Sequence, residues 1–222
     1  VGFDSDTHYT SAYDTALLSA AVSEYDCYND FFNTRLDYVR EGERQTQLLN
    51  TNKLMQRYDG IIGGKTGTTD NAGCCLAVWA KRGNMKLCAV ALGCKESEQR
   101  FTACENLLDY GFSGYELYRI SVKDDVLQPL PVTEGLSKDV DVRVKRLSTI
   151  VIPKGSSKRI EYTHTVTESL SAPVQYGEKV GEMRASLDGE EIFYSDIVTT
   201  KEVGELNFFS SLCIIISSFF RM

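Results

Sequence analysis

The sequence predicts an α+β protein: an antiparallel sheet with helices, followed by a small all-β sandwich and a C-terminal amphipathic helix. Three patterns support this prediction. Residues 74–81 and 85–92 are apolar runs of strand length joined by a Gly83-Asn84 turn, as in an antiparallel hairpin. Residues 96–110 space their apolar side chains three and four positions apart, which is the period of a helix. Beyond residue 121, short alternating runs separated by turn residues are typical of a β-sandwich.

The first 57 residues are expected to contain a helix, a second short segment and a polar stretch. Thr10 is suited to cap a helix, because a side-chain hydroxyl at this position can accept a backbone N–H. The apolar positions that follow repeat at three and four and predict a buried face: Tyr13, Ala16, Leu17, Ala20 and Ala21. A second short segment over residues 26–33 is expected to be helical or irregular. Residues 35–57 are polar, with a turn at residues 50–52.

Residues 60–69 are rich in glycine and β-branched side chains and are expected to begin the sheet. The two apolar runs come next, and Trp79 in the first of them is expected to lie in the core. The helix over 96–110 would place Phe101, Cys104, Leu107 and Leu108 on one apolar face. Gly111 is expected to end this helix, since glycine adopts the left-handed conformation found at helix ends.

The C-terminal half reads as strands after a domain boundary near residue 121. Val140, Val142 and Val144 alternate with charged residues, which indicates a half-buried strand. Further strand-like runs lie at 148–152, 159–166, 179–186 and 190–199. We therefore expect three parts: residues 1–121, an all-β domain over 122–203, and a separate helix over 204–222.

The tail carries an apolar stripe at helical spacing: Phe209, Leu212, Cys213, Ile216, Phe219 and Phe220. Such a stripe with serines beside it predicts a helix that lies in a membrane interface. Two alternatives remain open, namely a helix docked on the protein's own core and a transmembrane segment of marginal length.

Composition excludes several classes of function. Lys and Arg number 24 against 31 Asp and Glu, so the net charge is −7, and this acidic chain is not expected to bind nucleic acid. Only two histidines are present and no C-x-x-C spacing occurs, so neither a metal site nor a cofactor is expected. The seven cysteines are interpreted mainly as small buried apolar residues.

The chemically informative stretch is Lys65-Thr66-Gly67, followed by Thr68. The lysine offers a positive charge to a substrate carboxylate, and the threonine offers a hydroxyl. The glycine leaves room for a substrate backbone along the strand edge, and the Thr68 N–H can serve an oxyanion hole. The alternatives are a β-turn with an exposed lysine and a phosphate-binding loop, and the spacing Gly60 to Lys65 is one residue too short for the latter.

The longer run D-G-I-I-G-G-K-T-G-T-T-D-N-A-G-C-C-L-A-V-W-A resembles the D-alanyl-D-alanine carboxypeptidases, which are low-molecular-mass penicillin-binding proteins. His8-Tyr9-Thr10-Ser11-Ala12 resembles a helix start of that family. Arg100 through Phe112 resembles its R-x-x-x-x-x-x-L-L-x-W/Y-G-F helix. The resemblance implies part of a β-lactamase/DD-peptidase-like domain in residues 1–121, a β domain, and a membrane anchor at the C-terminus.

The family further implies a serine-type carboxypeptidase that removes the terminal D-alanine of peptidoglycan stem peptides through an acyl-enzyme. Its expected partners are stem peptides ending in D-Ala-D-Ala, β-lactam antibiotics and the membrane surface, at the outer face of the cytoplasmic membrane. Lys65, Thr66 and Gly67 would be the catalytic residues, and Thr68 and Arg100 would bind substrate. For Arg100 the alternative is a surface ion pair with Glu96. His8 is interpreted as a packing residue at the helix start rather than a base.

Two features depart from the family pattern. Ile62-Gly63-Gly64 crowds extra residues before Lys65, where a bulge is expected. No serine in the chain is followed three residues later by lysine, so the S-x-x-K nucleophile and base are absent, as is the S-x-N motif that follows them in the family. We therefore interpret the chain as the C-terminal part of such an enzyme, expected to be inactive alone. Alternatives are a non-catalytic cell-wall-binding module and a β-lactamase-related protein. Of the adjacent Cys74 and Cys75, at most one can line a cleft.

Overall fold

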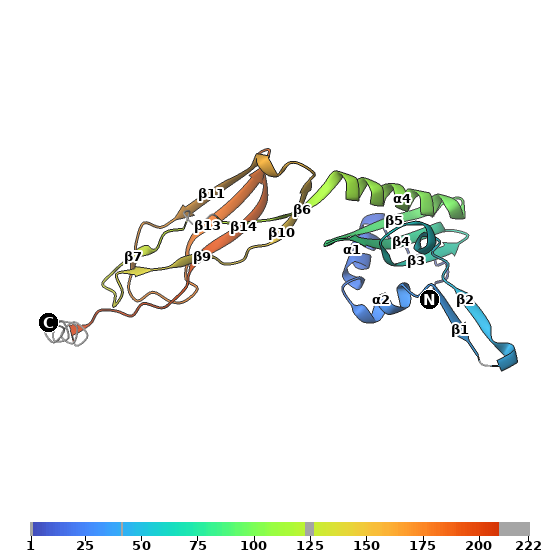
Figure 1. The fold of residues 1–222 in the computed structure, drawn as a ribbon, viewed down its shortest axis with the longest axis horizontal. Helices are drawn as coiled ribbons and strands as arrows, with labels where there is room; N and C mark the ends of the chain where they lie inside the picture. Colours follow the sequence, from blue (N-terminus) through green and yellow to red (C-terminus); the bar gives the residue numbers. More distant parts are fainter. Residues whose placement is uncertain (1, 41, 123–126, 209–222) are drawn as a thin grey trace. The chain divides into compact units, whose positions relative to one another are not determined.

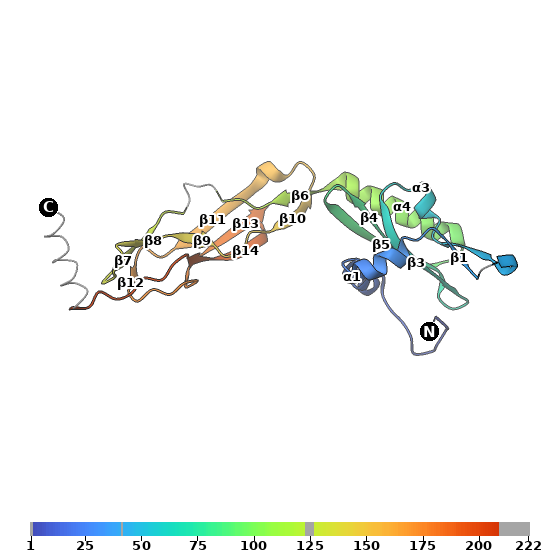
Figure 2. The same cartoon turned by 60° about the horizontal axis from the view of Figure 1, so that its bottom comes forward.

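The computed structural model describes residues 2–40, 42–122 and 127–208 and divides the chain into two compact units, Val1–Glu116 and Leu117–Met222 (Figures 1 and 2). The first unit combines helices with an antiparallel sheet, and the second is built from strands, which confirms the predicted α+β class. Strand β6 (Tyr115–Arg119) spans the division between the units, close to the position where the sequence places a boundary.

The first unit is organised around a three-stranded antiparallel sheet in the order β3-β4-β5. Strands β3 (Ile61–Thr69), β4 (Gly73–Arg82) and β5 (Met85–Cys94) follow one another in the chain. Helix α4 (Ser97–Gly114) packs on β4 and β5. Its buried side chains Phe101, Cys104 and Leu108 meet Leu76 and Val78 of the sheet to form the core of the unit. Leu107, which was expected on the same face, is instead 49% exposed.

Helix α4 continues past the residue expected to end it. Gly111 lies inside the helix, and a Cβ at this position would be 2.5 Å from Leu87 Cδ1 of β5. The glycine is therefore required for close packing of the helix on the sheet rather than for a left-handed cap. The helix ends at Gly114, where Tyr115 takes an extended conformation and begins β6.

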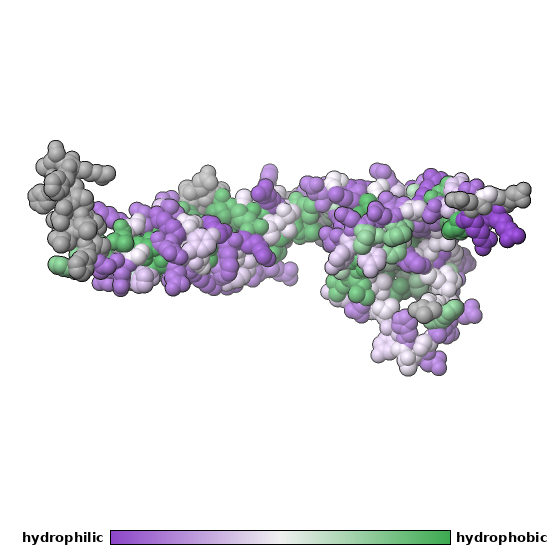
Figure 3. Space-filling view, turned by 90° about the horizontal axis from the view of Figure 1, so that it is seen from below, coloured by the Kyte–Doolittle hydropathy of each residue, from purple (hydrophilic) through white to green (hydrophobic). Residues whose placement is uncertain are grey.

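Helix α1 (Ala12–Val22) contacts β5 and β4 of the sheet. Helix α2 (Asp26–Phe32) contacts β3. The side chain of Ser11, rather than that of Thr10, caps α1 by accepting the N–H of Asp14. The predicted buried face of α1 is wrong, because no residue of the helix is buried and Tyr13 is 72% exposed. Figure 3 shows apolar side chains on the surface of this unit. Within the described residues, nothing covers this apolar face.

The polar stretch over residues 35–57 contains regular structure. Strands β1 (Leu36–Val39) and β2 (Thr46–Leu49) pair as an antiparallel hairpin, with a 3₁₀ turn η1 (Gly42–Arg44) between them. Every residue of both strands is exposed. Their sequences therefore lack the alternation of apolar and polar residues that predicts a half-buried strand. The short helix α3 (Leu54–Arg57) follows and buries Leu54 beneath α4 and the sheet.

The described part of the second unit contains three small sheets. The largest has the order β11-β13-β14-β9 and contains β11 (Ile160–Val166), β13 (Lys179–Leu187), β14 (Glu190–Thr199) and β9 (Val142–Val144). Another has the order β12-β7-β8, with β12 (Leu170–Ser171), β7 (Leu130–Thr133) and β8 (Asp139–Val140). The third pairs β10 (Thr149–Pro153) with β6, and a short 3₁₀ turn η2 (Ser157–Arg159) precedes β11.

The core of the second unit contains Ile120, Val140, Ala185 and Ile197, all fully buried. The single strand expected over residues 140–144 is two strands, because β8 pairs with β7 whereas β9 pairs with β14.

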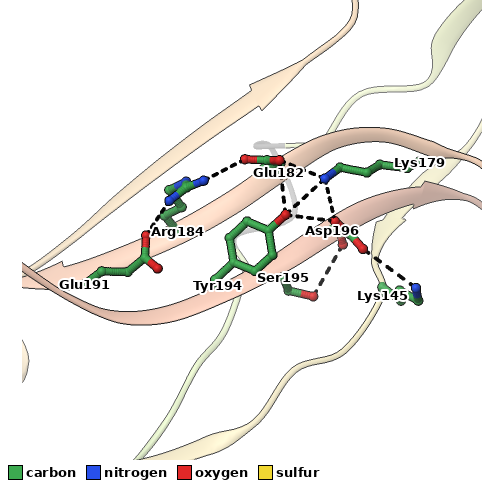
Figure 4. Close-up of polar contacts among 8 residues, drawn as sticks. All are labelled: Lys145, Lys179, Glu182, Arg184, Glu191, Tyr194, Ser195 and Asp196. Atoms are coloured by element: carbon green, nitrogen blue, oxygen red, sulfur yellow. Dashed lines mark hydrogen bonds and ion pairs between the residues drawn. The ribbon is translucent and has the colours of Figure 1, made fainter.

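The exposed face of β13 and β14 carries a network of charged side chains around one tyrosine (Figure 4). Its members are Lys145, Lys179, Glu182, Arg184, Glu191, Tyr194 and Asp196.

The tail is only partly described. Residues 209–222, which carry the apolar stripe proposed to bind a membrane interface, lie outside the described residues. Within the part of the chain that the structure describes, no helix has both the length and the apolar character needed to cross a membrane.

Candidate active site

The Lys65-Thr66-Gly67 motif lies on β3, at one edge of the three-stranded sheet. Strand β3 pairs with β4 in an antiparallel register that places Lys65 opposite Ala77 and Gly67 opposite Cys75. Among the described strands, none pairs with the other edge of β3. This free edge presents backbone groups to which an extended peptide can add.

The side chains of the motif alternate across the strand. Lys65 is exposed, its Nζ donates to the carbonyl of Thr66, and it forms no ion pair with a described residue. Thr66 is buried, with its Oγ1 2.5 Å from Thr51 Oγ1. Gly67 is open, because a Cβ there would meet no atom within 4 Å. The edge therefore presents an exposed cation and unobstructed backbone at Gly67, whereas the Thr66 hydroxyl is buried against Thr51.

The two glycines before Lys65 have packing roles. A Cβ on Gly63 would be 2.5 Å from Nε1 of Trp79, the residue directly opposite on β4. A Cβ on Gly64 would be 2.7 Å from Nδ2 of Asn52. The register of β3 and β4 also shifts between Ile61 and Gly63, at the position of the extra residues. These residues thus let β3 lie flat against large neighbours on both faces before it reaches the motif.

Helix α2 holds the Trp79 ring in this position. Its Nε1 donates to Asn29 Oδ1 at 3.2 Å, and its ring meets that of Phe32 edge-on with centroids 5.4 Å apart. Only 2% of Trp79 is exposed, which agrees with the expectation that it lies in a core. Helix α2 and the glycine-rich start of β3 therefore pack together through one indole ring.

Arg100 extends from α4 to the motif and is only 7% exposed. Its Nη1 donates to Gly67 O and Thr68 Oγ1, both at 3.0 Å, and to Cys75 O at 3.3 Å, while its Nη2 donates to Ser97 Oγ at 3.0 Å. The alternative surface pair with Glu96 is wrong, because Glu96 caps α4 in a reciprocal capping box with Gln99. Among the described residues, no carboxylate forms an ion pair with Arg100, so its charge meets only neutral hydrogen-bond acceptors there.

The turn at residues 50–52 lies beside the motif, which the sequence does not reveal. Asn50 Oδ1 accepts the Asn52 N–H, and Asn52 Oδ1 accepts the Leu54 N–H. Asn52 is 1% exposed, yet its Nδ2 has no hydrogen-bond partner. Thr51 places a second hydroxyl against Thr66. The run of turn-forming residues at 50–52 predicts the turn itself. Nothing in the sequence indicates that this turn contacts the strand that carries Lys65.

The remaining predicted groups have simpler surroundings. His8 is exposed, so it is not the packing residue expected at the helix start. Cys104 is fully buried, and burial raises the pKa of its thiol to about 12. Among the described cysteines the expectation of burial holds fully only for Cys104. Cys27 is exposed, and the others are half-buried: Cys74, Cys75, Cys88 and Cys94. No cluster suited to a metal ion occurs among residues 2–40, 42–122 and 127–208.

Comparisons with known proteins match both units. Residues 1–96 match the family described as D-alanyl-D-alanine carboxypeptidase, and residues 115–205 match the penicillin-binding protein 5, C-terminal domain. The D-alanyl-D-alanine carboxypeptidase DacF of Bacillus subtilis is 30% identical over 213 residues, covering 95% of this chain and 55% of that protein. The carboxypeptidase DacA of Escherichia coli K12 is 31% identical over 221 residues, covering 95% and 52%.

A solved structure has the same fold. Penicillin binding protein 5 from Haemophilus influenzae aligns with a TM-score of 0.75 at 24% identity, over 92% of this chain and 59% of that one. The chain spans about half the length of the curated relatives it matches. The matched families follow each other in the chain in the order that the sequence motifs predict. The chain therefore belongs to the serine D-alanyl-D-alanine carboxypeptidase family of low-molecular-mass penicillin-binding proteins.

Proposed function

We propose that this chain supplies the carboxylate-binding half of a D-alanyl-D-alanine carboxypeptidase site. The ligand is a peptidoglycan stem peptide that ends in D-Ala-D-Ala, and it lies along the free edge of β3. The relatives DacF and DacA are D-alanyl-D-alanine carboxypeptidases, which supports this substrate class. The observation that carries the proposal is a buried arginine without a described carboxylate partner, in contact with the strand that bears Lys65 and Thr66.

Each residue has a distinct role in the proposal. Lys65 Nζ and the Thr66 hydroxyl bind the terminal carboxylate from the strand. The Arg100 guanidinium lies behind Gly67 and Thr68 and stabilises that negative charge from within the unit. The open space beside Gly67 admits the D-alanine backbone, and the Thr68 N–H donates to the oxyanion that forms at the scissile carbonyl.

The reaction needs a nucleophile that the 222 residues do not contain in an S-x-x-K pattern. In the proposed enzyme, a serine from such a motif attacks the carbonyl between the two D-alanines and releases the terminal D-alanine. Water then hydrolyses the acyl-enzyme. β-Lactams resemble D-Ala-D-Ala and acylate the same serine, and the enzyme acts outside the cytoplasm, where peptidoglycan lies.

Fluorescent penicillin tests the proposal directly. We expect no covalent labelling of the 222-residue chain alone, and labelling when it is joined to the S-x-x-K and S-x-N segment of DacF. Replacing Lys65→Ala in the joined protein should reduce the labelling rate at least tenfold, because the lysine loses its hold on the carboxylate. The matched control is Lys81→Ala, which removes an exposed lysine from the neighbouring strand β4. Equal labelling of both variants, or labelling of the chain alone, would refute the assignment.

A second candidate function is a non-catalytic cell-wall-binding module, favoured by the lack of an S-x-x-K pattern in these residues. The two candidates differ in the penicillin experiment, because a wall-binding module would retain peptidoglycan without being labelled even when joined to the relative's segment. A β-lactamase is less well supported, since the penicillin-binding protein 5 C-terminal domain occupies residues 115–205.

We also propose that the tail binds the membrane surface through its apolar stripe over residues 209–220. Deleting residues 204–222 should release the protein from lipid vesicles in a flotation assay. Replacing Ile216→Asp alone should weaken binding in the same direction, because a charge would enter the apolar stripe. Unchanged flotation of the truncated protein would exclude the tail as the anchor.

A further inference from the structure

Cys74 and Cys94 are paired opposite each other in the β4–β5 hairpin, just beyond a register shift between Cys74 and Leu76. Directly opposed residues of an antiparallel pair have Cα atoms about 4.5–5.5 Å apart. A disulfide requires a Cα separation of about 4.4–6.8 Å. The two cysteines therefore meet the backbone requirement for a cross-strand disulfide, although both are free thiols in this structure.

Both side chains lie on the side of the sheet that faces α4. Cys74 Sγ accepts from Thr68 Oγ1 at 3.9 Å, and the same hydroxyl accepts from Arg100 of α4. Cys94 packs against the apolar cluster that contains Phe101 and Cys104 of that helix. Each cysteine is only half-buried, so a small reagent can reach its sulfur.

The neighbouring cysteines are poorer partners for Cys94. Cys104 is fully buried, its Sγ lies 3.9 Å from Leu76 O, and burial raises the pKa of its thiol, so little reactive thiolate forms. Cys75 directs its Sγ toward Ala72 O at 3.4 Å. Cys88 lies opposite Trp79 in the register rather than opposite a cysteine.

We propose that Cys74 and Cys94 are a redox modification site that forms a disulfide across the open end of the β4–β5 hairpin. The oxidant is a small-molecule disulfide. One cysteine thiolate attacks a sulfur of that molecule, and a thiol leaves. The second cysteine then displaces the other half of the molecule as a second thiol. Two cysteine thiols are oxidised and one external disulfide is reduced, so atoms and electrons balance.

The bridge would join the two strands at the end of the hairpin nearest the motif. Cys75 O in this segment accepts one of the Arg100 hydrogen bonds. Closing a loop between residues 74 and 94 also limits the freedom of the unfolded chain. Oxidation therefore stabilises the part of the sheet that holds Arg100, and this inference stands whether or not the proposed enzymatic function is correct.

Oxidised glutathione and peptide mass spectrometry test the site. The chain carrying Cys75→Ser is incubated with oxidised glutathione, its remaining thiols are alkylated, and its peptides are mapped. We expect a linked peptide that joins Cys74 to Cys94, reversed by dithiothreitol, and a higher melting temperature for the oxidised chain. Stable glutathione adducts on both residues without a link, or a link from Cys94 to another cysteine, would overturn the proposal.

Two variants provide controls. Cys74→Ser in the same background should lose both the linked peptide and the increase in melting temperature. Cys88→Ser should retain both, because this cysteine lies opposite Trp79. If Cys74→Ser kept the increase in melting temperature on oxidation, the stabilisation would come from another pair and the proposed site would be wrong.

Discussion

Replacing Gly63→Ala tests the reason for the glycine pair before the motif. The new Cβ would lie 2.5, 2.6 and 2.7 Å from three atoms of the Trp79 indole. The indole cannot easily retreat, because its Nε1 is bonded to Asn29 and its ring contacts Phe32. Overpacking of this kind costs about 1–3 kcal/mol. The reduced freedom of the unfolded chain offsets roughly 0.4–1 kcal/mol of that cost.

The net loss should therefore be about 1–2 kcal/mol, which lowers the melting temperature of a domain of this size by roughly 4–10 °C. Gly67→Ala is the matched control, since it is the same change on the same strand in open space. Its melting temperature should stay within about 2 °C of the parent, because surface substitutions away from special features change stability by less than about 0.5 kcal/mol. Calorimetry or circular dichroism measures both. Equal melting temperatures for the two variants would refute the packing argument.

Three further predictions concern other contacts. The Lys179 and Arg184 side chains beside Glu182 hold the pKa of that carboxyl at about 2, so its stabilising contribution is present above its usual pKa and is lost as the pH falls toward 2. Glu182→Gln should flatten the melting temperature between pH 5 and pH 2, and an unchanged profile would contradict the network. Arg100→Lys should weaken binding of an acyl-D-Ala-D-Ala ligand about tenfold or more, because hydrogen bonds from a charged guanidinium are worth about 1.5–3 kcal/mol. Unaltered affinity by calorimetry would exclude Arg100 from carboxylate binding. Thr51→Val should weaken the same binding and Thr51→Ser should restore it, whereas equal affinities would show that the Thr66 hydroxyl needs no partner.

Local patterns predicted the elements that lie nearest the motif. The β4–β5 hairpin follows from two apolar runs and a two-residue turn, and its strands fall where the sequence places them. The apolar period predicts helix α4 but not the position of its end, because Gly111 provides close contact with Leu87 of β5 inside the helix rather than a C-terminal cap. The sequence alone does not distinguish a glycine that caps a helix from one that allows close packing, because the difference depends on the neighbouring strand.

Long-range contacts account for what the sequence could not predict. The apolar face of α1 was expected to be buried, yet burial depends on a partner surface that the described residues do not provide. The contact between Thr51 and Thr66 joins residues fifteen positions apart. Arg100 was assigned to substrate binding from a family resemblance, and that role stays a prediction. Its burial against Gly67 and Thr68 is a tertiary fact that no local pattern contains.

The central claim is that the free edge of β3 recognises a terminal carboxylate. The most direct measurement compares the binding of N-acetyl-D-Ala-D-Ala with that of its C-terminal amide, followed by the backbone amide NMR signals of the chain. If this edge binds the carboxylate, N-acetyl-D-Ala-D-Ala should shift the signals of Thr66, Gly67 and Thr68 in a saturable way, and its C-terminal amide should bind at least tenfold more weakly. Equal binding of the two ligands, or shifts confined to residues away from β3, would contradict it.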